Sequence, residues 1–137
     1  MPTLSLLAAR NAVDAVCAEL GKLSVSAVIA VADDHGELIL LVRLDGARFS
    51  SITIAANKAW TAARECRTSR AVGQAARDPK TGFDIGYYGD PRYTGWGGGV
   101  PIVVGGVVVG AFAVSGLKEE DDMKWAEIGA SLISKPD

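Results

Sequence analysis

Charged residues gather at one junction in the first half of the chain, where an apolar run ends and a helical pattern begins. Arg43 and Asp45 end the run, and Lys58 lies in the helical pattern that follows. A guanidinium can hold a carboxylate with two hydrogen bonds, and a partly buried lysine can act as a base or a fixed positive charge. These residues indicate a carboxylate site, in which Lys58 or Asp45 would move a proton. An internal ion pair between Asp45 and either cation explains the same pattern equally well.

Ser51 lies at the start of the helical pattern that contains Lys58. Serine is a preferred N-cap residue, so we expect a capping role first, and we also count Ser51 among the candidate ligand-binding residues. Lys58 follows about two helical turns later, on roughly the same side of the helix. It can therefore point back toward the turn that contains Asp45.

A glycine-rich segment and a group of aromatic residues supply further candidates. Backbone amides around Gly98 and Gly99 could meet an anion, although a plain turn explains these glycines as well. Tyr87, Tyr88 and Trp96 could enclose a flat ligand, and a tyrosine hydroxyl could donate a proton. Aromatic residues also anchor long loops and line subunit interfaces, so a structural role is an equal alternative.

The sequence gives no firm indication of a metal or cofactor. His35 is the single histidine and lies in a predicted tight turn, where exposure is the usual expectation. It is the first candidate for a haem axial ligand, with Tyr87 or Tyr88 as replacements. Cys17 and Cys66 are far apart in sequence, which favours two reduced, buried thiols over a metal site. We expect no metal and keep haem as an option.

Length and composition predict one soluble domain over residues 1–137. No apolar run approaches the roughly 18 residues that a membrane helix needs. The net charge of -2 leaves no basic stripe for a phosphate backbone. Because the N-terminus also lacks the pattern of a signal peptide, we expect a cytoplasmic protein with no membrane or nucleic-acid partner.

Hydrophobic periodicity and turn residues predict helix, hairpin, two helices, long loop, hairpin and helix, in that order. The first helix is expected from Leu4 to Leu20, with Thr3 as its cap and Gly21 at its end. The other elements are expected at residues 26–32 and 37–43, 51–64, 69–77, 101–104 and 107–114, and 118–133.

This element order predicts an α/β fold with an antiparallel sheet, because the strands come in adjacent pairs. The helices at the two ends of the chain should cover one face, and the central helix should cover the other face or its edge. The loop between Asp78 and Gly99 is unusually long for a compact domain, and such loops are commonly functional or disordered. Its aromatic residues favour order.

Several short motifs in a fixed order resemble the GlcG/HbpS family, which includes the C-terminal domains of PduO-type proteins. The matching residues are Asp33 to Gly36, Arg43 with Asp45 to Ala47, Ser51-Ile52, Ile54-Ala55, Lys58-Ala59, Thr61-Ala62, Gly98 to Ile102, Val109 to Ala111, Val114 to Gly116, Asp122, Ala126 and Gly129. The resemblance implies a profilin-like sandwich with an antiparallel sheet of about five strands. It also implies oligomers, and functions that range from haem binding to roles beside corrinoid or glycolate metabolism.

Our primary functional hypothesis is a small-molecule-binding protein that holds a planar or carboxylate-bearing ligand between the Arg43 to Lys58 segment and the Tyr87 to Gly99 loop. One alternative is a cofactor-independent lyase or isomerase that acts on a small aromatic acid, with Arg43 on the carboxylate and Tyr87 or Tyr88 as the acid. Haem binding or sensing and a ligand-free interaction module are the others. An apolar composition and Val-rich strands also predict self-association.

Overall fold

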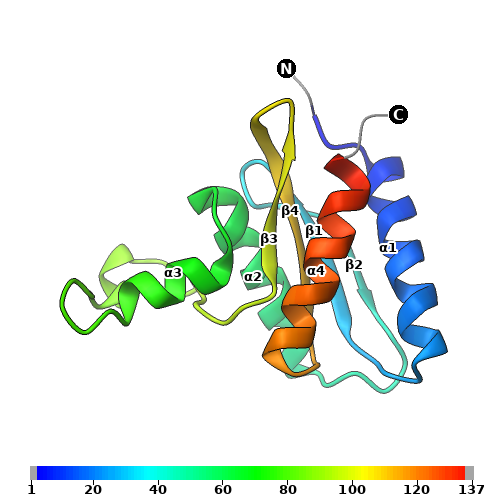
Figure 1. The fold of residues 1–137 in the computed structure, drawn as a ribbon, viewed down its shortest axis with the longest axis horizontal. Coiled ribbons are helices and arrows are strands. Elements are labelled where there is room, and N and C mark those ends of the chain that lie inside the picture. Colours follow the sequence, from blue (N-terminus) through cyan, green and yellow to red (C-terminus); the bar gives the residue numbers. More distant parts are fainter. Residues whose placement is uncertain (1–2, 135–137) are drawn as a thin grey trace.

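A computed structural model describes residues 3–134 (Figure 1). The elements follow the predicted order, and each bound lies within a few residues of its expected position. They are α1 (Leu6–Lys22), β1 (Val28–Asp33), β2 (Leu38–Arg43), α2 (Ser50–Glu65), α3 (Ser69–Ala76), the 3₁₀ helix η1 (Ile85–Tyr88), β3 (Gly99–Val104), β4 (Val107–Ser115) and α4 (Glu119–Ser134).

The sheet is antiparallel and has the order β2-β1-β4-β3. The two predicted hairpins form it, and they join through β1 and β4, where Val28 lies opposite Ser115 and Asp33 lies opposite Gly110. The described residues form four strands, so the expected count of about five is wrong. The fold class is confirmed, because two hairpins side by side already give a sheet whose central strands can be covered on both faces.

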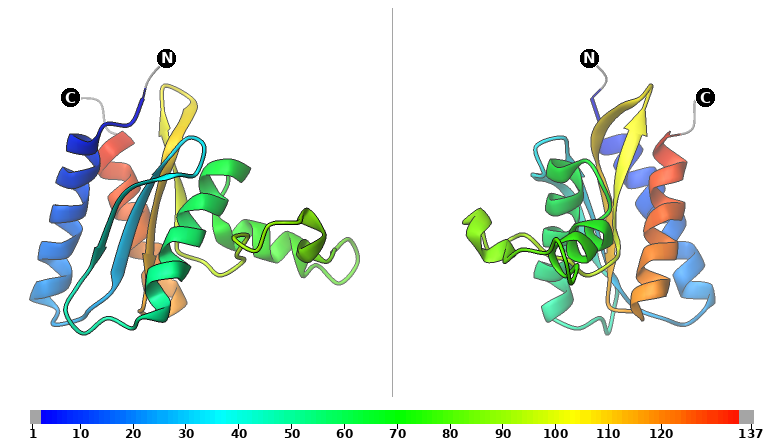
Figure 2. Two further views of the ribbon diagram at one scale, coloured as in Figure 1. Left: turned by 180° about the vertical axis from the view of Figure 1, so that it is seen from behind. Right: turned by 60° about the vertical axis from the view of Figure 1, so that its left-hand side comes forward.

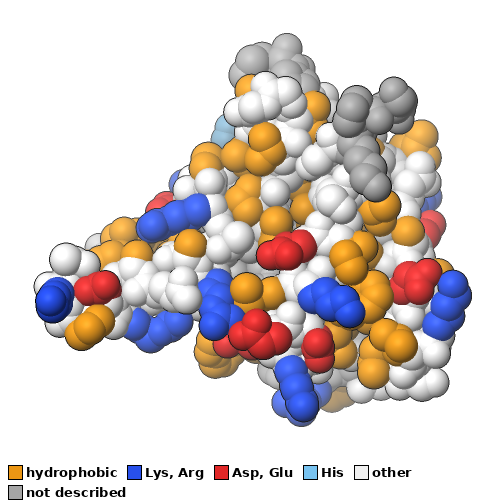
Figure 3. All heavy atoms as spheres, in the orientation of Figure 1, with side chains coloured by type: hydrophobic (Ala, Val, Ile, Leu, Met, Phe, Trp, Pro, Cys, Tyr) orange, Lys and Arg blue, Asp and Glu red, His pale blue; other side chains and the backbone are white. Residues whose placement is uncertain are grey.

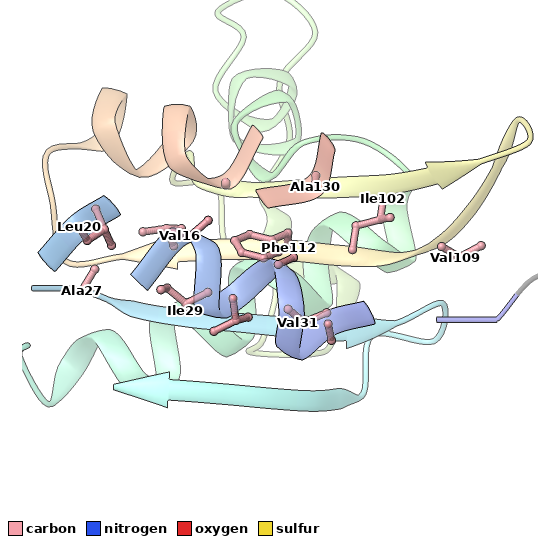
Figure 4. Close-up of a cluster of buried hydrophobic side chains, with 14 residues drawn as sticks. Val16, Leu20, Ala27, Ile29, Val31, Ile102, Val109, Phe112 and Ala130 are labelled. Atoms are coloured by element: carbon pink, nitrogen blue, oxygen red, sulfur yellow. The ribbon is translucent and has the colours of Figure 1, made fainter. Parts of the chain in front are cut away.

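Helices cover both faces of this sheet, as the element order predicts (Figure 2). Alternate residues of β1 and β4 point to opposite faces. On the face covered by α1 and α4, large side chains such as Leu20, Ile29 and Phe112 form the main core (Figure 4). On the opposite face the packing partners of α2 are small, and the buried set is dominated by alanines: Ala30, Ala32, Ala55, Ala59, Ala62, Ala63, Ala111 and Ala113.

Helix starts differ from the predicted caps. Ser5, rather than Thr3, caps α1 by accepting a hydrogen bond from the Ala8 amide, and the helix continues through Gly21. Ser51 does not cap α2: it lies inside the first turn, while Phe49 occupies the N-cap position with no side-chain hydrogen bond. Because Phe49 already has helical φ and ψ and occupies the N-cap position, α2 begins two residues earlier than a cap at Ser51 would require.

The segment from α3 to Tyr93, here called the arm, extends away from the sheet and its covering helices (Figures 1 and 2). A series of aromatic contacts holds it together: Phe83 stacks on Tyr88 at 5.4 Å, and Tyr93 lies edge-on to Tyr88 at 4.9 Å and to Trp60 of α2 at 4.7 Å. The aromatic residues therefore account for the order of this long connection, as expected from the sequence.

Short polar turns complete the arm. The side chain of Asp78 accepts hydrogen bonds from the amides of Lys80 and Thr81, and Asp84 does the same for Gly86. Asp90 accepts from Arg92, and these bonds lower the pKa of Asp90 to about 2. Such local side-chain to backbone bonds fix turns without a core.

Two helical glycines give a matched test of the packing. A Cβ at Gly129 of α4 would lie 2.2 Å from the Phe112 ring, whereas one at Gly21 of α1 would contact nothing within 4 Å. We expect Gly129→Ala to lower the free energy of unfolding by about 1–3 kcal/mol through overpacking. Gly21→Ala should raise it by up to about 1 kcal/mol, because alanine has the higher helix propensity. Urea denaturation of both variants measures this, and equal effects would contradict the tight packing of α4 on Phe112.

Candidate functional site

An open cleft of about 620 Å³ lies where the first turns of α2 and α4 meet the end of β4. Three of the residues predicted from the sequence, Ser51, Lys58 and Trp96, lie along it. Charged side chains gather on the surface over the start of α4, near the base of the arm (Figure 3). The complete lining is Arg48, Ser50, Ser51, Ile54, Lys58, Trp96, Gly97, Ser115, Gly116, Leu117, Lys118, Glu119 and Asp122.

A buried ion pair forms the floor of this cleft. The Nζ atom of Lys58 donates hydrogen bonds to Oδ2 of Asp122 at 3.1 Å and to the carbonyl of Val114 at 3.0 Å. Lys58 is 2% exposed and Asp122 is 4% exposed. The other carboxylate oxygen of Asp122 accepts a hydrogen bond from the Leu117 amide at 3.0 Å. The pair therefore joins α2, β4 and α4 at one point.

Burial shifts both groups toward their neutral forms. It lowers the pKa of Lys58 and raises the pKa of Asp122, because a low-dielectric environment disfavours each charge. The partner's opposite charge acts against the shift in both cases, and the Leu117 amide also favours the Asp122 carboxylate. The proton that the pair shares is thus held less firmly by Lys58 than by a lysine in water.

Gly98 and Gly99 make room for this pair rather than line the cleft. A Cβ at Gly98 would lie 2.6 Å from the Val114 carbonyl oxygen and 2.8 Å from Lys58 Nζ. A Cβ at Gly99 would lie 2.3 Å from the Lys58 carbonyl oxygen. Gly98 also has φ +127°, which side chains rarely adopt. Gly98 is thus required by its close approach to Val114 and the ion pair, and Gly99 by the close packing of the β3 start against α2.

The neighbouring amides already have partners in the protein. The Gly97 amide donates to Glu119 at 2.7 Å, and the Gly99 amide donates to the Ser69 hydroxyl at 2.9 Å. The anion that Gly97 meets is therefore the carboxylate of Glu119, not an external ligand.

Two cations stand at the rim of the cleft. Arg48 precedes α2 and Lys118 precedes α4, and both side chains are exposed. Neither forms an ion pair with a carboxylate of residues 3–134. The first turn of α2 contains no acidic residue, whereas that of α4 contains four. The positive end of the α2 dipole is therefore not neutralised by its own first turn.

Trp96 stands at the mouth of the cleft and is 58% exposed. Its position is fixed by its backbone: the buried Ser69 hydroxyl donates to the Trp96 carbonyl at 2.6 Å. Upstream, Thr61 of α2 donates to the Arg92 carbonyl and accepts from the Thr94 amide. The segment 92–96 connects the arm to the cleft and is therefore anchored by hydrogen bonds to α2 and α3.

Arg43 and Asp45 lie outside the cleft. Arg43 is exposed at the end of β2, with its guanidinium 5.2 Å from the ring centre of Phe49. Asp45 is exposed, and its carbonyl accepts a hydrogen bond from Ser26. The alternative ion pair of Asp45 with Lys58 does not form, because the partner of Lys58 is Asp122. Arg48, rather than Arg43, lines the cleft.

The two tyrosines and the histidine also lie elsewhere. Tyr87 is 90% exposed on the arm, and Tyr88 takes part in the aromatic contacts with Phe83 and Tyr93. His35 is exposed in the β1–β2 turn, with Nδ1 3.1 Å from Asp34. Cys66 is exposed rather than buried. These positions do not bring the tyrosines to Lys58.

Sequence reasoning missed Arg48, Lys118 and Asp122 as site residues. A signal for Asp122 was present: together with Ala126, Gly129 and Ala130 it forms the buried stripe of α4 at helical spacing. An acid on such a stripe requires a buried partner. The two rim cations had no comparable signal, since exposed Arg and Lys residues are common.

The sequence model described as "Haem degrading protein HbpS-like" matches residues 4–131. The chain belongs to this HbpS-like family. It is 31% identical over 133 residues to an uncharacterized 15.0 kDa protein of the Citrobacter freundii dhaT-dhaS intergenic region, covering 97% of this chain and 94% of that protein. It is 34% identical over 110 residues to protein GlcG of Escherichia coli K12, covering 80% and 79%. The predicted GlcG/HbpS resemblance is confirmed.

Solved structures agree with the fold. Klebsiella pneumoniae protein ORFY superposes with a TM-score of 0.92 at 28% identity, covering 100% of this chain and 94% of that one. The PduOC complex with haem gives a TM-score of 0.87 at 22% identity, covering 96% and 95%. At that identity the second likeness shows the fold alone. Among residues 3–134, no helix combines the length and apolar character needed to cross a bilayer.

The family description raises the question of whether haem fits the cleft. Haem iron is ordinarily held by His, Cys, Met or Tyr. None of these residue types is among the described residues that line the cleft, and His35 lies in the β1–β2 turn. The cleft therefore does not offer an ordinary axial ligand.

The buried pair generates a prediction about stability. Lys58→Met should lower the free energy of unfolding by about 3–5 kcal/mol near neutral pH, because it leaves Asp122 buried and uncompensated. The folded-state pKa of Asp122 is already raised, so the folded variant binds an extra proton between the unfolded and folded pKa values. Its free energy of unfolding should therefore rise as the pH falls through that window.

Chemical denaturation at about pH 8 and about pH 5 measures this effect, since an unpaired buried carboxyl titrates above its usual range. The deficit of Lys58→Met relative to the parent protein should be smaller at the lower pH. Lys80→Met, on the exposed arm, should show no such dependence. A deficit that is the same at both pH values would contradict the buried charge on Asp122.

Proposed function

We propose that this protein binds a small carboxylate-bearing molecule in the cleft. The observation that carries the proposal is the pair of exposed cations, Arg48 and Lys118, above the buried amine of Lys58. A carboxylate between the rim cations would gain charge-assisted hydrogen bonds that no described carboxylate supplies. Each such bond to a charged group contributes about 1.5–3 kcal/mol.

The surroundings of the cations support the same ligand class. The α2 N-terminus adds a positive potential at the side of Arg48, and Ser50 and Ser51 add hydroxyl groups nearby. Lys58 in its charged form has three N–H donors, of which Val114 and Asp122 accept two. The third is available to a ligand on the cleft floor.

The shape of the site favours a planar body on the ligand. The indole of Trp96 is largely exposed at the mouth, and Ile54 and Leu117 add apolar surface. A flat ring stacks well on an exposed aromatic side chain. An aromatic or conjugated acid would use both the apolar mouth and the cationic rim.

Haem is the second candidate ligand, supported by the family description and by the haem complex of the fold neighbour PduOC. Haem is planar and carries two propionates, so Arg48, Lys118 and Trp96 would suit those parts of it. The lack of an ordinary axial donor in the described lining argues that recognition of the carboxylates, not of the iron, is what this cleft serves.

Arg48→Ala should weaken the binding of benzoate, a planar carboxylate, by about 10–100-fold, the equivalent of one charge-assisted hydrogen bond. Isotope-edited NMR titration of the folded variant measures the affinity and also reports which amides respond. Arg43→Ala is the matched control, because Arg43 ends β2 outside the cleft. It should keep the affinity within about twofold.

The opposite result for the two arginine variants would show that the ligand binds outside the cleft. If Arg43→Ala loses affinity and Arg48→Ala does not, the ligand binds on the outer side of the turn, beside Asp45. If benzoate shifts no amide around the cleft, and a panel of other planar acids and haem behaves in the same way, the proposed function is wrong.

We also propose that the arm mediates self-association. The arm extends away from the body of the domain (Figure 2), and its aromatic residues Phe83, Tyr87 and Tyr88 are exposed. A second copy could cover this apolar surface. Tyr87→Ser should shift the protein toward monomers and weaken the association by at least about tenfold. The monomer should remain stable, because Tyr87 is 90% exposed.

Light scattering over a micromolar dilution series measures this shift. Phe49→Ser is the matched control, since Phe49 is another exposed aromatic residue but lies before α2 rather than on the arm. A parent protein that is monomeric throughout the series would rule out self-association. A larger effect of Phe49→Ser would place the contact on the body of the domain.

A further inference from the structure

The amine of Lys58 lines the cleft but has few neighbours within hydrogen-bonding distance. Its two acceptors are the Val114 carbonyl and Oδ2 of Asp122. A neutral primary amine has two N–H groups and one lone pair. When the proton between Nζ and Asp122 passes to the carboxylate, rotation about the Cε–Nζ bond turns the lone pair of the neutral amine toward the cleft, while one N–H stays on the Val114 carbonyl.

We propose that the Lys58 amine forms a covalent imine with a small 2-oxo acid, and that Asp122 supplies the proton with which water leaves. This proposal rests on the proposed function, since it names a subclass of carboxylate ligand for the same cleft. It assigns Lys58 as a catalytic residue and Asp122 as its proton partner.

The reaction balances with groups that line the cleft. The Lys58 nitrogen attacks the carbonyl carbon, the carbonyl oxygen takes up a proton, and the nitrogen gives one up, which yields a carbinolamine. The carbinolamine hydroxyl then takes the Asp122 proton and leaves as water. The product is an iminium on Lys58 beside the Asp122 carboxylate, 3.1 Å away in the present pair. No oxidant or reductant is needed for this step.

The electrostatics of the pair support both roles. Burial lowers the pKa of Lys58, which increases the fraction of nucleophilic amine, and raises the pKa of Asp122, which helps it to carry a proton. The charged groups that line the cleft with the pair are Glu119, which favours the ammonium, and the rim cations Arg48 and Lys118.

The carboxylate of a 2-oxo acid lies directly beside its reacting carbonyl. The ligand would therefore need cationic groups near the amine, and Arg48 and Lys118 line the same cleft. Two further hydroxyl groups, those of Ser51 and Ser115, belong to buried residues of the lining. They are suited to hydrogen-bond the carbonyl oxygen as it becomes a hydroxyl.

Reductive trapping with pyruvate tests the proposal. The folded protein is incubated with pyruvate and cyanoborohydride, which converts an imine into a stable secondary amine, and is then analysed by intact mass and peptide mapping. We expect one carboxyethyl group per chain, on Lys58. Labelling of Lys58 should exceed that of every other lysine, because burial lowers its pKa and the rim cations would hold the pyruvate carboxylate beside it.

Two variants sharpen the result. Lys118→Arg removes the amine at the rim but keeps its charge, and it should still be labelled on Lys58. Lys58→Arg should lose the adduct. Because Lys58→Arg alters a buried pair and can fail to fold, the peptide map of the parent protein is the primary readout and needs no variant.

The outcomes separate this proposal from the proposed function. If pyruvate shifts the amides around the cleft in an NMR titration but labels Lys58 no more than exposed lysines, the covalent step is wrong and carboxylate binding stands. Labelling centred on Lys118 would likewise overturn the role of Lys58. If neither pyruvate nor any planar acid binds at the cleft, both proposals fail together.

Discussion

The ion pair of Lys58 and Asp122 joins the two helical layers beside the start of β3. Lys58 comes from α2 on one face of the sheet, and Asp122 comes from α4 on the other. Removing two such charges from water costs several kcal/mol for each ion, so the pair needs further hydrogen bonds to stabilise it. The Val114 carbonyl accepts a hydrogen bond from Lys58, and the Leu117 amide donates one to Asp122. These bonds fix the end of β4 against both helices. The cleft floor is therefore tied to α2, β4 and α4 together.

The unequal size of the side chains on the two faces explains how Lys58 reaches this point. Alanines on α2, β1 and β4 let the helix lie close to the sheet, while larger side chains such as Phe112 and Leu20 fill the other face beneath α1 and α4. The close approach of α2 requires Gly99 at the start of β3, because a side chain there would overlap the Lys58 backbone. A lysine on a helix so close to the sheet is almost wholly buried, and its partner Asp122 comes from the other face of the sheet.

The elements of this fold could be predicted from the sequence because their signals are local. Glycine turns at Gly36 and Gly105-Gly106, β-branched runs and alanine-rich periodicity each act over a few residues. The site could be predicted only in part, because its contacts are long-range. Lys58 was found as a polar residue on an apolar helix, but its partner is 64 residues away. Arg43 was predicted and Arg48 was missed, because which of the two reaches the cleft depends on how α2 packs on the sheet.

The arm shows how a local structure can set the geometry of a distant site. Its turns close through Asp78, Asp84 and Asp90 and its aromatic residues pack on one another, so much of its order arises within the arm. It is attached to α2 through Trp60 and Thr61 and to the cleft through Ser69, which holds the Trp96 carbonyl and the Gly99 amide at once. In the proposed assembly, a movement of the arm caused by contact with a second copy would therefore be transmitted to Trp96 at the cleft mouth and to Gly99 at the start of β3. The proposed contact surface on the arm and the proposed ligand cleft are thus connected through the buried hydroxyl of Ser69.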